Sequence, residues 1–232
     1  MLKPKPRPAT YADLEALTPN LVGEILFGVL HASPRPTPRH LLAAGHLSAE
    51  LTGPFDRGKN GPGGWIFIME PELHLGPHVV VPDLAGWRRE RLTPFPETAF
   101  IETPPDWLCE VLSPSTSALD RTDKLTVYAE FGVGHCWYVD PLARTLELFE
   151  LTGGKWQLAA AFKDADTITA PPFAVHAFRS LCCVRPRGDG HASDVVGVIA
   201  DQAFRDPKLN GDSLLISRHG CSNHDAPSAR YK

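Results

Sequence analysis

Two carboxylates follow short apolar runs in the middle of the chain. Asp83 follows Val79-Val80-Val81-Pro82, and Glu110 follows Trp107-Leu108-Cys109. Short apolar runs bounded by turn residues are typical of buried strands, so each run should bring one carboxylate to the core or its edge. An ionised carboxylate there costs several kcal/mol unless a cation compensates its charge. A divalent metal ion is the obvious candidate for that cation.

The spacing of the two acids favours a shared ion. Asp83 and Glu110 lie 27 positions apart, which suits a hairpin or two neighbouring strands. Carboxylates at the ends of adjacent strands lie roughly 5 Å apart. They can hold one Mg²⁺ or Mn²⁺, with the main-chain carbonyl of Val111 as a further ligand. Such an ion lowers the pKa of a bound water and neutralises charge on a phosphate, which is the chemistry of phosphodiester hydrolysis.

A lysine and an aspartate follow on the next predicted helix. Lys124 would orient or deprotonate the attacking water, or stabilise the transition state as a point charge. Asp120 lies four residues earlier, so the two side chains share a helix face and can pair. The alternative without function is a solvated ion pair worth a few tenths of a kcal/mol. Spacing alone leaves both interpretations open.

The elements that must position these residues alternate between strands and helices. Helices are predicted at residues 10–17 and 39–51 and from Thr116 or Ser117 to Gly132. Alternating prolines make residues 33–38 a loop. Strands are predicted at residues 24–31 with a turn near Gly28, and at 65–69, 73–75, 79–83, 107–112, 136–139, 145–151 and 156–162.

Composition excludes several classes of protein. The chain has 232 residues, 43% of them hydrophobic, which is ample for a core, and a net charge of −4. That charge argues against a generic nucleic-acid coat protein, although an enzyme with a local basic groove remains compatible. Five cysteines without a C-x-x-C spacing favour reduced thiols over disulfides or a zinc site. Because no apolar segment reaches the length of a membrane span, we expect a soluble cytoplasmic protein without a membrane partner.

The ends of the chain differ in composition from its middle. Residues 1–9 are Pro-rich and basic, which predicts a flexible N-terminal arm. Residues 184–232 are rich in Arg, Asp, Gly, Ser and His and contain two short apolar islands, which predicts a weakly ordered C-terminal tail. The alternative is that these islands dock as one extra strand or helix. One folded domain is therefore expected at residues 10–183.

Several separate motifs, in order, resemble the bacterial Uma family, whose members are described as restriction endonucleases and placed in the PD-(D/E)XK nuclease superfamily. The resemblance covers roughly Thr10 to Leu181. The motifs are Pro82-Asp83, Glu110 to Thr116, Asp120, Lys124 with Tyr128, Gly132-Val133 and Trp137 to Pro141. The resemblance implies an α/β (α+β) fold over residues 10–183, a restriction-endonuclease-like core in which helices flank a mixed central sheet.

The resemblance also assigns roles to individual residues. Asp83 matches the motif aspartate and Glu110 the second acid, but Leu112 stands where Glu-x-Lys would place a lysine. In this family the lysine has moved to the following helix, so Lys124 is the match. Two other positions that recur in the family are Glu24 and His40, each implied as a metal ligand or a phosphate contact. The alternatives are a strand-edge charge for Glu24 and a helix cap or packing residue for His40.

Together, the residues and the resemblance predict a Mg²⁺- or Mn²⁺-dependent endonuclease that hydrolyses DNA. Its groove would carry phosphate-contacting arginines on the rim, namely Arg35, Arg39 or the run from Arg88 to Arg91. A homodimer is compatible, since nucleases that cut both strands commonly dimerise. The main alternative is a catalytically silent nucleic-acid-binding or interaction protein on the same fold. A serine hydrolase built on Ser113 or Ser115 is a distant third, because the chain lacks a G-x-S-x-G elbow.

Overall fold

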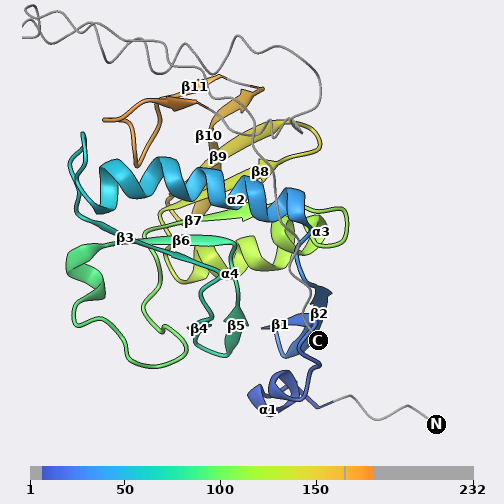
Figure 1. Ribbon diagram of the computed structural model, residues 1–232. Helices are drawn as coiled ribbons and strands as arrows, with labels where there is room; N and C mark the ends of the chain where they lie inside the picture. The colour runs from blue at the N-terminus through green and yellow to red at the C-terminus, as the bar shows by residue number, and fades with distance from the viewer. Residues whose placement is uncertain (1–6, 165, 180–232) are drawn as a thin grey trace, which may run out of the picture. The chain divides into compact units, whose positions relative to one another are not determined.

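A six-stranded sheet carries the segments that contain the predicted acids (Figure 1). In the computed structural model, which describes residues 7–164 and 166–179, its strand order is β10-β9-β8-β7-β6-β3. The strands are β3 (Trp65–Met69), β6 (Leu84–Arg88), β7 (Trp107–Val111), β8 (His135–Asp140), β9 (Thr145–Thr152) and β10 (Lys155–Lys163). β7 and β8 pair in parallel and the other neighbours are antiparallel. The predicted mixed central sheet is therefore confirmed.

A second sheet of four strands has the order β2-β1-β5-β4. Its strands are β1 (Leu21–Leu26), β2 (Val29–Pro34), β4 (Leu73–Leu75) and β5 (His78–Val80). The β1–β2 hairpin turns at Phe27 and Gly28, which both have positive φ, as a type I′ turn requires. The predicted turn near Gly28 is confirmed. A short pair, β11 (Thr167–Ile168) with β12 (Phe178–Arg179), forms a third sheet.

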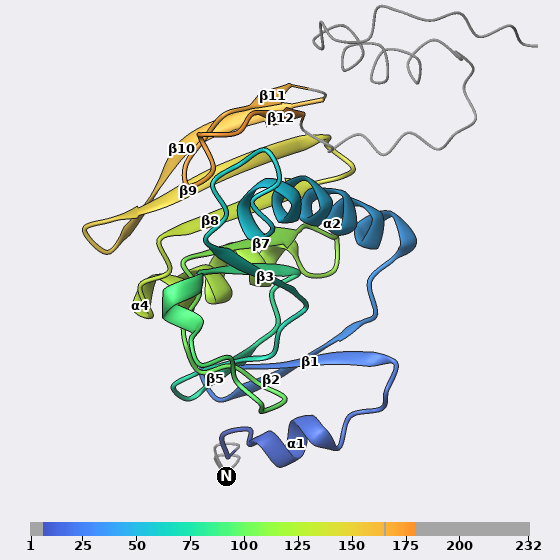
Figure 2. The ribbon, with the colours of Figure 1, turned by 60° about the vertical axis from the view of Figure 1, so that its left-hand side comes forward.

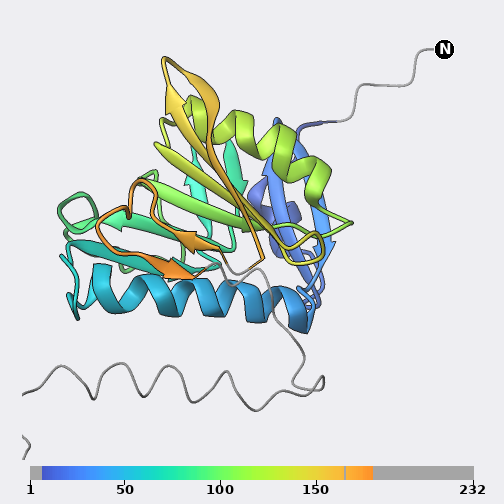
Figure 3. The same cartoon turned by 90° about the horizontal axis from the view of Figure 1, so that it is seen from above.

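Helices cover both faces of the six-stranded sheet. Figures 2 and 3 show α2 along one face, and Figure 3 shows the helical segment that ends in α4 on the opposite side. The α-helices are α1 (Tyr11–Glu15), α2 (Pro38–Leu51), α3 (Ser117–Leu119) and α4 (Leu125–Glu130). The remaining helical turns are η1 (Thr52–Asp56), η2 (Arg89–Leu92) and η3 (Asp120–Lys124). Among the described residues, no helix is long and apolar enough to cross a membrane.

Strand β7 is buried on both faces because it lies inside the six-stranded sheet. Alternate side chains of a strand point to opposite faces. Trp107, Cys109 and Val111 pack in the cluster that contains the α2 side chains, whereas Leu108 packs in the cluster that contains α4. Glu110 shares the α4 face, so it brings a carboxylate into an otherwise apolar layer.

The strand predicted at residues 79–83 is confirmed only for Val79 and Val80, and its predicted end at Asp83 is wrong. β5 ends at Val80 in the four-stranded sheet, the chain crosses over at residues 81–83, and β6 begins in the six-stranded sheet. β6 is not evident from the sequence, because a central glycine weakens its strand pattern. Gly86 is needed for packing, since a Cβ there would lie 2.9 Å from Phe67 Cε1.

The predicted helices are present with small changes at their ends. α1 begins with a capping box between Thr10 and Asp13, as its sequence indicates. The helix predicted at residues 39–51 corresponds to α2, which ends at Leu51, and the helical turn η1 continues from it to Asp56. The third predicted helix corresponds to α3, η3 and α4 in succession. Residues 1–6 of the expected arm and the whole expected tail at 184–232 lie outside the described residues.

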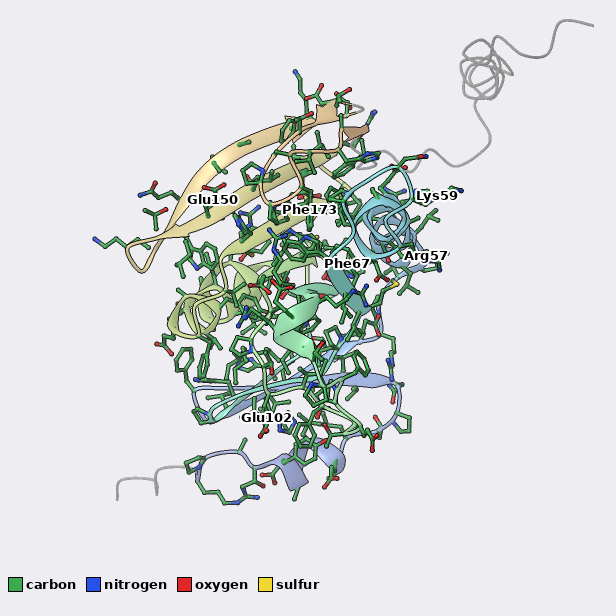
Figure 4. The ribbon with its side chains drawn as sticks, turned by 90° about the vertical axis from the view of Figure 1, so that its left-hand side faces the viewer. Arg57, Lys59, Phe67, Glu102, Glu150 and Phe173 are labelled. Atoms are coloured by element: carbon green, nitrogen blue, oxygen red, sulfur yellow. The ribbon has the colours of Figure 1, made fainter. Side chains whose placement is uncertain are left out.

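Phe173 lies at the centre of the aromatic layer that covers the α2 face of the sheet, and Figure 4 labels it beside Phe67. Its ring centroid lies between 4.7 and 5.7 Å from five other aromatic rings. Those rings belong to Phe55, Trp65, Phe67, Trp107 and Trp137. The segment between β11 and β12 is therefore part of the core.

Replacement of Phe173 by alanine should lower the free energy of unfolding by about 3–5 kcal/mol, because the ring is fully buried. Urea unfolding followed by tryptophan fluorescence measures this change. Phe95→Ala is the control, since that ring is 59% exposed and its loss should change the stability by less than about 0.5 kcal/mol. Equal effects of the two substitutions would show that the segment does not pack on the sheet.

Candidate active site

Asp83 and Glu110 lie side by side at one edge of the six-stranded sheet. The register pairs Leu84 of β6 with Cys109 of β7, so the residue before β6 lies beside the residue that follows Cys109. The main-chain N–H of Val111 donates to Asp83 Oδ2 over 2.7 Å. The two carboxylates are therefore neighbours, as predicted, although Asp83 precedes β6 and does not end a strand formed by residues 79–83.

Lys124 is buried among the acids. Its Nζ lies 2.8 Å from Glu110 Oε1, 3.0 Å from Glu24 Oε1 and 3.5 Å from Asp120 Oδ1. The Lys124 side chain is only 3% exposed, and Asp120 is also buried. The alternative of a solvated ion pair between Asp120 and Lys124 is therefore wrong. The predicted convergence of Asp83, Glu110 and Lys124 is present, because all three line one pocket.

A widened helical turn delivers Lys124 to this position. Asp120 and Lys124 begin and end η3, a π-helical turn, and such turns often occur at functional sites. Tyr138 OH donates to the main-chain oxygen of Asp120 over 2.7 Å, and Tyr128 OH donates to Glu110 Oε1 over 2.6 Å. The sequence analysis gave Tyr128 no role, although its position four residues after Lys124 places both on one helix face.

Glu24 and His40 both belong to the cluster of acids. Glu24 Oε1 accepts from the main-chain N–H of Val81 over 2.8 Å and also pairs with the lysine. It is buried, so it is no strand-edge charge. His40 Nε2 lies 2.5 Å from Asp83 Oδ1. Thr37, rather than His40, caps α2, since the Thr37 side chain accepts from the His40 N–H.

Four carboxylates and one ammonium share this buried volume. Burial, with the Asp120, Asp83 and Glu24 charges added, raises the pKa of Glu110 well above its ordinary value, although Lys124 opposes the change. Burial alone would lower the pKa of Lys124, but the carboxylates of Glu110, Glu24 and Asp120 raise it well above its ordinary value. The raised pKa values of Glu110 and Lys124 both mean that the cluster favours additional positive charge, whether a proton or a cation.

The donor set fits a hard divalent ion. Asp83 and Glu110 offer carboxylate oxygens, and the carbonyl of Val111 belongs to the same strand end. Within residues 7–164 and 166–179, no three His, Cys, Asp or Glu side chains are arranged as a metal cage. Mg²⁺ does not require such a cage, because it keeps several waters and commonly binds one or two carboxylates.

The pocket above the acids has a volume of about 260 Å³. Its other walls are the segment from Ser33 to Thr37 and the turn that contains Ser113, Ser115 and Thr116. The loop predicted at residues 33–38 is shorter than expected, because β2 includes Ser33 and Pro34 and α2 begins at Pro38. The three arginines predicted to contact phosphates lie in different places. Arg35 lines this pocket and Arg39 lines the adjoining one. Arg88 lies at the opposite end of β6, with its guanidinium 4.2 Å from the ring centroid of Trp65, so the structure does not bring it to the acids.

Replacement of Lys124 by methionine should lower the free energy of unfolding at pH 8 by about 3–5 kcal/mol, because it leaves buried carboxylates without a counter-ion. The loss should be smaller at pH 5. An acid whose pKa is raised by folding destabilises the protein as the pH rises, and Glu110 takes a proton more readily at pH 5. Urea unfolding at both pH values measures the effect.

The matched control is Lys163→Met on β10, which is exposed and should change the stability by less than about 0.5 kcal/mol at either pH. Mn²⁺ should stabilise the Lys124→Met protein, since a bound cation replaces the ammonium. A Lys124→Met protein as stable as the control would contradict the role of Lys124 as counter-ion.

Comparisons with known proteins identify a family and a similar fold. The chain matches the family model Uma2, described as "Putative restriction endonuclease", over residues 8–203, which extends beyond residue 183. Its fold is similar to the crystal structure of a protein from Anabaena variabilis ATCC 29413 described as "a putative nuclease belonging to DUF820". The TM-score is 0.58 at 20% identity, covering 70% of this chain and 89% of that one. No curated protein matches the chain. The extent of the family match and the shared fold establish that the chain is a member of the Uma2 family.

Proposed function

We propose that the chain is an endonuclease that hydrolyses DNA phosphodiester bonds with the help of Mg²⁺ or Mn²⁺. The observation that carries this proposal is the burial of Lys124 against Glu110 beside Asp83, at the floor of an open pocket. Two acids and a lysine in this arrangement suit phosphodiester hydrolysis. The description of the Uma2 family supports the same activity.

Asp83, Glu110 and the carbonyl of Val111 would hold the ion. When bound there, the ion supplies a water of lowered pKa and offsets charge on the phosphate. The protein fixes the orientation of both acids in advance. His40 Nε2 and the Val111 N–H hold the two oxygens of Asp83, while Tyr128 and Lys124 hold Glu110.

Lys124 acts on the attacking water or the phosphate. Lys124 lines the pocket, and carboxylates hold its Nζ, so one of its three N–H donors would turn from a carboxylate to the attacking water or to a phosphate oxygen. Hydrolysis joins the water oxygen to phosphorus and breaks one P–O ester bond, and the leaving oxygen takes up a proton. The ammonium therefore orients the nucleophile or stabilises charge on the transition state.

One feature of the site favours the alternative of a catalytically silent nucleic-acid-binding or interaction protein. Each acid already has a protein partner, Lys124 for Glu110 and His40 for Asp83, so the charges are partly satisfied without metal. Metal-dependent cleavage separates the two functions. The serine hydrolase is not supported, because Ser113 Oγ contacts the hydroxyls of Ser115 and Thr116, whereas His40 Nε2 contacts Asp83.

Asp83→Asn and Glu110→Gln should each reduce metal-dependent cleavage at least about 100-fold, because loss of an anionic ligand removes several kcal/mol of transition-state stabilisation. Nicking of supercoiled plasmid in Mg²⁺ or Mn²⁺ measures the effect, and circular dichroism verifies folding. Glu130→Gln is the control, since Glu130 is exposed at the end of α4. Wild-type rates for Asp83→Asn would defeat the assignment, and an inactive wild type would favour the silent protein.

A further inference from the structure

We propose that the mouth of the pocket is a phosphate-binding site that holds the DNA backbone above the acids, an inference that rests on the proposed function. We call this surface the phosphate rim. Its members are the side chains of the two pocket walls, residues 33–37 and 113–116, that can donate hydrogen bonds to phosphate oxygens. They are Ser33, Arg35, Thr37, Ser113, Ser115 and Thr116.

The phosphate rim and the acids differ in their exposure to solvent. Glu24, Glu110 and Lys124 are almost fully buried, whereas Arg35 and Ser115 are exposed although they line the same pocket. The acids therefore form the floor and the phosphate rim forms the entrance. A ligand that enters from solvent meets the phosphate rim first.

The charge of the floor explains why a polyanion needs such an entrance. Four carboxylates surround one ammonium, so the floor repels a phosphate until a proton or a cation compensates the remaining negative charge. The phosphate rim carries no acid and one arginine. Serine, threonine and arginine side chains account for many contacts between proteins and DNA phosphates. Attraction for the DNA backbone must therefore come from the phosphate rim.

Arg35 can be redirected to a phosphate at little cost. Its Nη1 lies 3.9 Å from Glu70 Oε2, and its Nε donates to the main-chain oxygen of Pro19 over 3.4 Å. The Arg35 side chain is 59% exposed, and ion pairs this exposed contribute about 0–1 kcal/mol. A guanidinium can instead form two parallel hydrogen bonds to phosphate oxygens.

The hydroxyls of the 113–116 turn lie close enough together to contact one phosphate. Ser113 Oγ lies 3.0 Å from Ser115 Oγ and 2.9 Å from Thr116 Oγ1. The turn is held by main-chain bonds, because the N–H groups of Thr116 and Ser117 both donate to the Ser113 oxygen. On the other wall, Thr37 is fixed as the cap of α2. Both walls thus present their donors from anchored segments.

The test measures DNA affinity without catalysis. Fluorescence anisotropy of a fluorescein-labelled DNA duplex is recorded with the full chain in Ca²⁺, which supplies the floor with a cation in place of Mg²⁺ or Mn²⁺, over a series of NaCl concentrations. Arg35→Gln should weaken binding about 10-fold and flatten the slope of log K against log [NaCl] by about 0.9, because one phosphate contact is lost. Ser33→Ala/Ser115→Ala should weaken binding several-fold with the slope unchanged, because hydroxyls release no counterions.

Arg91→Gln is the matched control, since Arg91 is exposed, is paired with Asp106 and follows the far end of β6. It should leave both affinity and slope unchanged. Circular dichroism verifies that each variant is folded. Three results would each overturn the phosphate rim. They are binding by the Arg35→Gln variant as tight as that of the wild type, absence of duplex binding by the wild type, and displacement of the duplex by an equal concentration of inorganic phosphate.

This result and the endonuclease proposal can fail separately. Loss of affinity in Arg35→Gln together with an inactive wild type would uphold the phosphate rim and remove the endonuclease. Metal-dependent nicking by the wild type, together with unaltered DNA binding by Arg35→Gln, would uphold the endonuclease and remove the phosphate rim.

Discussion

The burial of one ammonium among four carboxylates is the interaction on which the rest of the site depends. Lys124 compensates the charge of Glu24, Glu110 and Asp120 in a volume that water barely reaches. Removal of one partner from such a cluster is expensive, so each acid must be placed accurately. One lysine is too little for four acids, so the cluster favours a further proton or cation.

The fold supplies these acids from segments that are distant in sequence. Glu24 comes from β1, Asp83 precedes β6, Glu110 lies near the end of β7, and Asp120 begins η3. Burial of β7 on both faces allows one acid to enter an apolar layer without exposing it. The tyrosines of α4 and β8 then bond to Glu110 and to the main chain of η3. The buried strands and helices hold the acids at the floor of the pocket, and the segments 33–37 and 113–116 form its entrance.

Much of the site could be predicted from the sequence because apolar runs identify strands, and helical spacing identifies a shared face. The strand that contains Glu110 followed from such a pattern, and the matched motifs added Lys124, but Asp83 lies beside Glu110 through β6, which its sequence did not indicate. Helical spacing says nothing about what packs on that face, so the burial of Asp120 could not be foreseen. Arg88 lies only five residues after Asp83, but an extended chain of that length spans about 17 Å, which takes it away from the acids.

Calorimetric titration of Mn²⁺ into the wild type and into Asp83→Asn/Glu110→Gln tests the central claim most directly, since this claim concerns a floor that needs a further cation. The account predicts binding by the wild type and none by the double variant, with both proteins folded. A folded wild type that binds no Mn²⁺ at millimolar concentrations would contradict it. The carboxylates would then be satisfied by Lys124 and His40 alone.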